Sequence, residues 1–239
     1  MKKVLFLFLI FVNFSIAQVL NIAVSANAGF ALKEVVKEFQ KKYKNIKINL
    51  IVSSSGKLAS QILNGAPYDV FLSADMYYPQ ILYENKVAKT KPKVYAYGVL
   101  VLWSFKIKNL NINSLKTAKK IAIANPKIAP YGKRALEAIH FFKMYKDVKS
   151  KLVLGESVSQ VNQYIIKKLV DLGFTSKSSI FAYAKKGYWI EIDKNTYSPI
   201  EQGIVLISDK KEAKEFFDFV LSEKSKQIFK NYGYEINGK

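Results

Sequence analysis

The sequence predicts an α/β protein with two lobes and a ligand cleft between them. Three observations support this fold class: short β-like runs alternate with longer amphipathic runs, a second region repeats the alternation, and a chain of 239 residues, 50% of them hydrophobic, can build two cores. Because strand–helix–strand units place successive strands in parallel, we expect each lobe to hold a mainly parallel sheet flanked by helices. A single sheet containing all the strands is the alternative.

The first region has the order strand, helix, strand, helix, strand. Compact apolar runs at 20–24, 46–52 and 69–72 are typical of buried strands. Between them, apolar residues recur at helical spacing across 29–43 and 57–63. This order predicts a parallel sheet with helices on its faces.

The second region follows the same pattern, and the chain then returns to the first lobe. We assign residues 18–96 plus 200–239 to lobe 1 and residues 97–199 to lobe 2. Two crossings between the lobes would place a ligand cleft between them. The expected strands are 99–103, 121–124, 151–154, 173–175, 189–192 and 203–207, and the expected helices are 132–145, 159–172 and 211–229.

The N-terminus has the features of a secretory signal peptide. Lys2 and Lys3 precede an apolar run over 4–14, and the small residues Ser15 and Ala17 follow it. We expect residues 1–17 to be removed and the mature protein to be periplasmic; a retained N-terminal anchor is the alternative. The apolar run is short for a membrane span.

Composition excludes several classes of function. The chain has no cysteine and only one histidine, His140, which excludes thiolate zinc sites, cysteine nucleophiles and multi-histidine metal centres. The formal charge of +20 comes from dispersed lysines, and Arg134 is the only arginine. Since arginine is the usual reader of bases and phosphates, we expect no nucleic-acid partner. A basic adhesin or membrane-associated protein remains an alternative.

Polar or glycine-containing turns connect four expected strands to the helices that follow. Helix N-termini at such turns offer unpaired backbone N–H groups and a positive dipole end, which suit an anion. None of the turns has the spacing of a nucleotide-binding loop. In the first turn, Asn27 could cap the next helix and also offer an amide N–H to an anion. The turns are 25–29, 53–56, 125–132 and 155–158.

An enzymatic interpretation has one candidate set. Asp69 and Asp75 flank the strand at 69–72, and a hydrolase could use them with a serine. The structural interpretation makes Asp69 a strand-end residue and Asp75 a turn or helix cap. His140 lies within an amphipathic helix beside two phenylalanines, which favours a packed or surface position, so we expect no enzymatic activity.

The turn segments together resemble a known family. Residues 53–75, 125–132, 155–160 and 197–200 are similar, in the same order, to segments of the periplasmic molybdate-binding proteins of ABC transporters, which are type II periplasmic solute-binding proteins. The resemblance covers essentially the whole mature chain. It implies the two-lobed periplasmic-binding-protein fold, a monomer, a membrane permease as partner, and molybdate or tungstate as ligand without any cofactor. A tungstate- or sulfate-selective protein of the same fold is the alternative.

The resemblance also implies a set of ligand contacts. The oxyanion would be held by residues from all four turns, mostly through neutral N–H and O–H donors, so no lysine is needed. Ser54 is a further possible contact. Some members place tyrosine where Ser176 stands here, so Ser176 is another possible contact. The expected contacts are Ala26, Asn27, Ser55, Tyr131 and the backbone of Val158.

Overall fold

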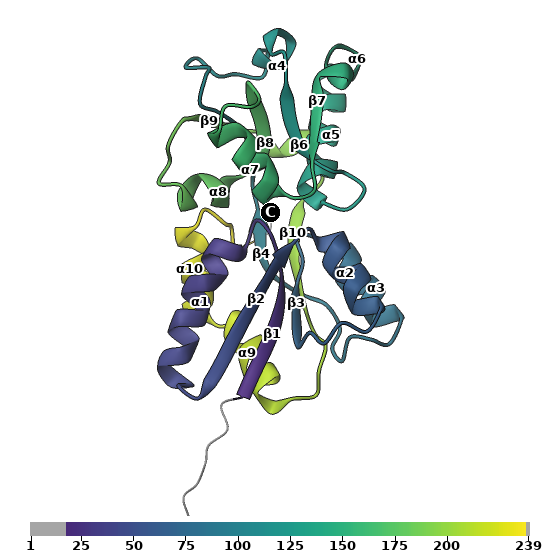
Figure 1. Cartoon of the computed structure of the whole chain (residues 1–239), viewed down its shortest axis with the longest axis vertical. Coiled ribbons are helices and arrows are strands. Elements are labelled where there is room, and N and C mark those ends of the chain that lie inside the picture. Colours follow the sequence, from purple (N-terminus) through teal and green to yellow (C-terminus); the bar gives the residue numbers. More distant parts are fainter. Residues whose placement is uncertain (1–17, 238–239) are drawn as a thin grey trace, which may run out of the picture.

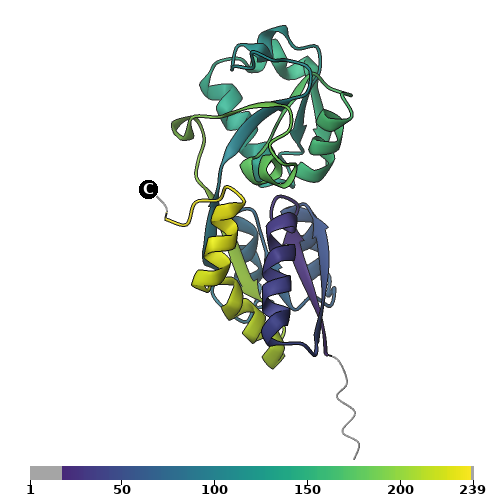
Figure 2. The same ribbon diagram turned by 90° about the vertical axis from the view of Figure 1, so that its left-hand side faces the viewer.

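The computed structural model describes residues 18–237, which form two α/β lobes stacked along the long axis of the molecule (Figures 1 and 2). Each lobe is built on its own five-stranded sheet. The two-lobed α/β fold is therefore confirmed, and the single-sheet alternative is excluded. The expected signal peptide, residues 1–17, lies outside the described residues. Within them, no helix has the length and apolar character needed to cross a membrane.

The first lobe contains both ends of the described chain. In its sheet, β1 runs parallel to β2 and β3, whereas β10 runs antiparallel to β3 and β4. The strand order is β2-β1-β3-β10-β4, with bounds β1 (Gln18–Ser25), β2 (Ile46–Ser53), β3 (Val70–Leu72), β4 (Lys93–Gly98) and β10 (Ile200–Leu206).

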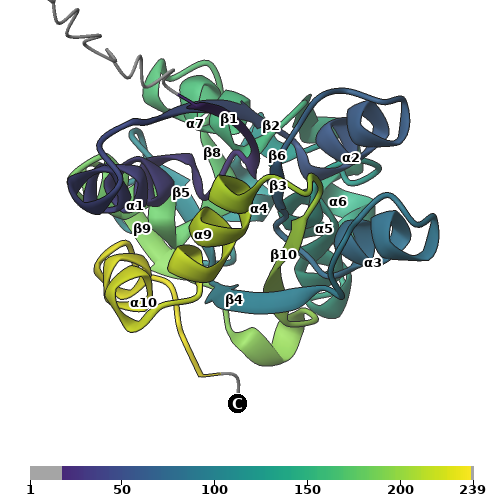
Figure 3. The ribbon, with the colours of Figure 1, turned by 90° about the horizontal axis from the view of Figure 1, so that it is seen from below.

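Alternating side chains of this sheet build two separate cores, as the pleat of a strand requires. Ile22 and Leu72 face α1 (Gly29–Lys42), α9 (Lys211–Val220) and α10 (Glu223–Asn231). Ala23 and Phe71 face α2 (Ser55–Leu63) and α3 (Tyr77–Glu84) on the opposite side. Figure 3 shows these two helical layers on either side of the sheet.

The second sheet has one continuous core that includes the fully buried Trp103 and Phe174. Its strand order is β7-β6-β8-β5-β9. The strands are β5 (Leu100–Ser104), β6 (Ile121–Ala124), β7 (Leu152–Gly155), β8 (Leu172–Ser176) and β9 (Tyr188–Glu191), and the helices are α4 (Ser114–Thr117), α5 (Pro130–Phe141), α6 (Tyr145–Val148), α7 (Val158–Ile166) and α8 (Lys177–Ala182).

Both sheets are mixed rather than mainly parallel. In the first sheet β10 is the antiparallel strand, and in the second sheet β5 runs antiparallel to β8 and β9. These two strands are the ones that carry the chain across from the other lobe. A strand that enters a lobe from the side of the cleft runs opposite to strands that end there, which explains the reversal.

Two expected helices end earlier than the sequence pattern indicates, and a third is divided in two. The helix expected over 132–145 stops at Phe141, and the one over 159–172 stops at Ile166. Just after them, Lys143 and Lys168 adopt left-handed backbone angles, with φ of 58° and 55°, which terminate a helix. The helix expected over 211–229 is split into α9 and α10, because the Ser222 side chain caps a new helix.

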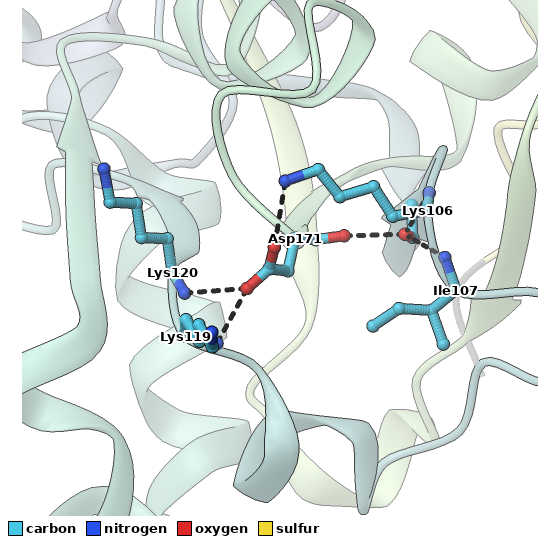
Figure 4. A network of polar contacts seen from close by, with 6 residues as sticks. Lys106, Ile107, Lys119, Lys120 and Asp171 are labelled. Atoms are coloured by element: carbon cyan, nitrogen blue, oxygen red, sulfur yellow. Dashed lines mark hydrogen bonds and ion pairs between the residues drawn. The ribbon is translucent and has the colours of Figure 1, made fainter.

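A polar network centred on Asp171 connects three segments of the second lobe (Figure 4). One carboxylate oxygen of Asp171 accepts hydrogen bonds from the backbone N–H groups of Lys119 (2.7 Å) and Lys120 (3.1 Å), and the other pairs with the Lys106 ammonium at 2.9 Å. The Asp171 carbonyl accepts from the Ser104 hydroxyl at 2.6 Å. These bonds tie β5 and its following loop to the start of β6.

Candidate anion-binding site

The four strand-to-helix turns meet between the lobes around one small cavity. Its free volume is about 10 Å³, which suits a water molecule or a small inorganic ion rather than an organic ligand. Of the described residues that line it, none carries a charged side chain. The lining consists of Ser25, Ala26, Asn27, Ser54, Ser55, Ala74, Ala129, Pro130, Tyr131, Ser157 and Val158.

Each of the four turns presents at this cavity a buried backbone N–H group that has no hydrogen-bond acceptor among residues 18–237. These groups belong to Asn27, Ser55, Tyr131 and Val158, and the buried N–H of Ser54 beside them also has no acceptor in this range. Ser55 and Val158 are the first residues of α2 and α7, and Tyr131 is the second residue of α5. A buried N–H group without an acceptor is costly, so these four donors favour an anion between them.

The helices around the cavity begin without side-chain caps. For α1, α2, α5 and α7, no side chain of the described chain caps the N-terminus, although Ser54 and Ser157 stand at N-cap positions. By contrast, Ser176 and Ser222 do cap α8 and α10, which contribute no residue to the cavity wall. The donors that serines commonly satisfy are thus left free where the four turns converge.

Hydroxyl groups add further donors. The Ser55 hydroxyl accepts a hydrogen bond from the Ala74 N–H at 2.9 Å, which leaves its own proton available to an anion. The hydroxyls of Ser25, Ser54 and Tyr131 are buried and have no partner within the described chain. Ser25 belongs to the first expected turn, 25–29, but not to the expected contacts; in the structure it is the last residue of β1 and lines the cavity.

The Tyr131 hydroxyl reaches from the second lobe to the crossing between the lobes. A Cβ atom on Gly98 would lie 2.2 Å from this oxygen, so only glycine allows the approach. Burial raises the pKa of Tyr131 well above its ordinary value, and the neighbouring Tyr234 adds to the effect. The Asn27 side chain lies beside the hydroxyl without hydrogen-bonding geometry. The phenol therefore stays protonated at neutral pH.

One expected contact, Ala26, and one possible contact, Ser176, have other bonds. The Ala26 N–H donates to the Ser53 carbonyl at 2.9 Å, so Ala26 contributes wall rather than a free donor. Ser176 does not line the cavity: it is fully buried and accepts from the Ser179 N–H at 3.2 Å, which caps α8. The other expected contacts, and Ser54, lie together on the cavity wall.

Contacts between the lobes enclose the site. The Gly56 N–H on α2 donates to the Ile128 carbonyl at 2.9 Å, and the Tyr78 hydroxyl donates to the Lys127 carbonyl at 3.3 Å. Across the cavity, the Ser178 hydroxyl on α8 donates to the Asn27 carbonyl at 2.9 Å. The two lobes thus meet on both sides of the free donors.

The candidate carboxylates have structural partners instead of a catalytic arrangement. Asp69 accepts from the Ser208 hydroxyl at 2.7 Å and pairs with Lys210 at 3.0 Å. Asp75 accepts from the Ser73 hydroxyl at 2.9 Å. Burial raises the Asp75 pKa above its ordinary value, against the lowering effect of that bond. His140 stacks on Tyr145 with 4.4 Å between ring centroids. It is therefore not placed to activate Ser73 or Ser208, the serines that bond to these carboxylates.

A larger cavity of about 470 Å³ opens beside the small one, with Ala129 and Pro130 in the wall of both. Its wall carries charges of both signs, with Lys127, Lys133 and Arg134 beside Asp75 and Glu201. Arg134 is paired with Glu137 at 2.7 Å. The two carboxylates oppose an anion in the larger cavity, whereas the wall of the small cavity has no carboxylate. Residues 18–237 contain no cluster of histidine, aspartate and glutamate that could hold a metal ion.

Two lobes that close on a buried set of neutral donors define a solute-binding protein. The chain belongs to the bacterial extracellular solute-binding protein family, whose model matches residues 20–235. A molybdate-binding protein of Azotobacter vinelandii, ModA, is 33% identical over 226 residues, which cover 90% of this chain and 89% of that protein. A molybdate-binding protein of Rhodobacter capsulatus is 32% identical over 237 residues, covering 92% and 94%.

Comparison with solved structures also finds solute-binding proteins. The A. vinelandii periplasmic molybdate-binding protein superposes with a TM-score of 0.85 at 29% identity, covering 92% of this chain and 100% of that one. The Mycobacterium tuberculosis sulfate-binding protein SubI shares the fold, with a TM-score of 0.77 at 10% identity over 91% of this chain and 86% of its own. The curated relatives are named as binding proteins, and this chain is a binding protein rather than an enzyme.

Proposed function

We propose that this protein is an extracytoplasmic receptor that captures molybdate between its lobes and delivers it to the membrane permease of an ABC transporter. One observation carries the proposal: four buried N–H groups without acceptors, one from each turn, surround one cavity without charged side chains. The names of the relatives supply the identity of the anion.

The energetics of such a site are sufficient without a cation. A hydrogen bond to a charged group contributes roughly 1.5–3 kcal/mol net, and the site offers four N–H donors and the Ser55 hydroxyl. Micromolar affinity requires about 8 kcal/mol, so five such bonds can exceed it after the cost of closure. Helix dipoles at α2, α5 and α7 add favourable potential.

We further propose that tungstate binds at the same donors, since it has nearly the size and charge of molybdate. Sulfate is smaller and would leave some donors too distant. The receptor acts as a periplasmic monomer after removal of its signal peptide. Its contacts are Asn27, Ser55, Tyr131 and Val158, with Ala26 as wall and Ser54 as a further donor.

Calorimetric titration of the purified mature protein with molybdate, tungstate, sulfate and phosphate tests the proposal. We expect one tight site per chain for molybdate and tungstate, and at least a hundredfold weaker binding of sulfate and phosphate. Tighter sulfate binding would assign the protein to a sulfate-selective group of the same fold. Absence of binding by all four anions would refute an oxyanion receptor.

A further inference from the structure

Both hydrogens of the Asn27 side-chain amide are engaged by residues of the first lobe. One hydrogen of its Nδ2 group is donated to Gln202 Oε1 at 2.7 Å, and the other to the Tyr234 hydroxyl at 2.8 Å. The Tyr234 hydroxyl in turn donates to the Asn27 carbonyl at 2.9 Å. All three residues are at most 4% exposed, so water does not compete for these bonds.

These bonds determine which donor Asn27 can offer to a ligand. A side-chain amide has two N–H hydrogens, and both are used. The backbone N–H of the same residue is free and the residue lines the cavity. Tyr234 holds Asn27 at two points, because its single hydroxyl accepts from the side chain and donates to the main-chain carbonyl.

We propose that Tyr234, with Gln202, is a positioning residue that locks Asn27 so that its backbone N–H, and not its side-chain amide, donates to the oxyanion. This inference rests on the proposed function. Neither residue lines the cavity, so both act through Asn27. Gln202 belongs to β10, and Tyr234 lies in the C-terminal segment after α10, so both are far from Asn27 in sequence.

Tyr234 keeps its proton over the working range of the protein. Burial raises its pKa above the ordinary value, while the hydrogen bonds with Ser178 and Asn27 act in the opposite direction. The hydroxyl therefore remains a donor to the Asn27 carbonyl at neutral and mildly alkaline pH.

The chain offers a matched control for Tyr234→Phe. Tyr95 is also buried and also packs on Phe229, with ring centroids 5.0 Å apart against 5.6 Å for Tyr234. Its hydroxyl makes a long 3.4 Å contact with Gln202 and also lies beside the Ser25 hydroxyl, but it has no contact with Asn27. We expect Tyr234→Phe to weaken molybdate binding about tenfold and Tyr95→Phe less than twofold. Equal losses in the two variants would overturn the inference.

A double-mutant cycle separates positioning from general support of the fold. Asn27→Ala keeps the backbone N–H and the carbonyl that accepts from Tyr234, but removes the side-chain bond, which is the other point at which Tyr234 holds the residue. We expect Tyr234→Phe to cause a clearly smaller loss of affinity in the Asn27→Ala background than in the wild type. A second tenfold loss there would show that Tyr234 acts independently of Asn27, and would overturn the inference. Should Tyr234→Phe not fold, Gln202→Met, which removes the other acceptor, takes its place in the cycle.

The wild-type titration keeps the two proposals distinguishable. If wild-type protein binds none of the oxyanions, the proposed function fails. If it binds molybdate but Tyr234→Phe and Gln202→Met both bind equally well, only the positioning role fails. Melting curves without ligand check that each variant is folded.

Discussion

At the residue scale, Ser55 shows how one hydroxyl is prepared for an anion. Its oxygen accepts from the Ala74 N–H, so the lone pair has a protein partner and the proton points to another acceptor. We expect Ser55→Ala to weaken molybdate binding by about 1–3 kcal/mol, the contribution of a hydrogen bond to a charged group. Calorimetry measures this difference.

The exposed Ser60 on the same helix provides the control. Ser60→Ala should bind molybdate as the wild type does, with an unchanged melting temperature. A Ser55→Ala protein with wild-type affinity would show that the hydroxyl of Ser55 does not contact the anion.

At the scale of elements, the N-terminus of α2 is close to the second lobe only because Gly56 lacks a side chain. A Cβ atom there would lie 2.5 Å from the Tyr78 hydroxyl and 3.0 Å from the Ile128 Cα. We expect Gly56→Ala to weaken molybdate binding about tenfold, because the added carbon prevents full approach of the lobes. Small-angle scattering should show less compaction on saturation with molybdate than in the wild type.

The unliganded Gly56→Ala protein should not be less stable, since alanine is favoured over glycine in a helix by about 1 kcal/mol and the Tyr78 hydroxyl, the far end of a side chain of the same lobe, can shift away from the added carbon. A lower melting temperature without ligand would mean that the substitution damages the first lobe rather than closure. Wild-type affinity and compaction would mean that the lobes have room for the added carbon.

The Asp171 network ties elements of the second lobe together and should respond to acid. Burial tends to raise the Asp171 pKa, but hydrogen bonds from Lys106, Lys119 and Lys120 outweigh it and lower the pKa below its ordinary value of 3.8. The ionised form is thus the one that the fold stabilises. We expect Asp171→Asn to reduce stability by about 1 kcal/mol at pH 7, measured by thermal unfolding.

The sign of the shift fixes the pH dependence. A lowered pKa contributes stability above the ordinary value of 3.8 and loses it as the pH falls through the lower folded-state pKa. The difference between wild type and Asp171→Asn should therefore be constant from pH 7 to about 5 and narrow below 3.8. Asp147→Asn, at an exposed carboxylate of α6, should show little difference at any pH. If the difference in stability between wild type and Asp171→Asn increased as the pH fell, this account would be contradicted.

At the scale of the whole molecule, the formal charge of +20 stands beside a cavity lined by uncharged side chains. None of the proposed donors titrates near neutrality, because the pKa of Tyr131 is raised and amides and serine hydroxyls do not ionise. We expect molybdate affinity to be nearly constant between about pH 6 and 9. It should fall only modestly with salt, since buried hydrogen bonds are screened less than surface charges.

Titrations across that pH range at two ionic strengths test this expectation. A lysine-based site would lose affinity steeply with salt and towards high pH, as ammonium groups lose their protons. Such a result would exclude binding by neutral donors even if molybdate were the ligand.

Local patterns determined the elements and the four turns of this protein. Periodic burial indicated β1, α1 and β2 close to their observed bounds, and the polar turns before α2 and α7 were recognisable because helix starts have characteristic residues. The same local patterns did not reveal β4, α3 or α8; they extended two helices too far and merged α9 with α10. Left-handed residues such as Lys143 end a helix without leaving a signal in hydrophobic spacing.

Only the tertiary structure decided which donors are free. Ser54 and Ser157 have the sequence of ordinary caps, yet they leave their helices uncapped, whereas Ser176 is a real cap. The side-chain amide of Asn27 donates to Gln202 and Tyr234, which are 175 and 207 positions away in sequence. Both of its hydrogens are therefore used, and the backbone N–H is the donor that remains for a ligand. Sequence determines local conformation through short-range sterics and periodic burial, but the acceptor of each polar group depends on which distant segments the fold brings beside it.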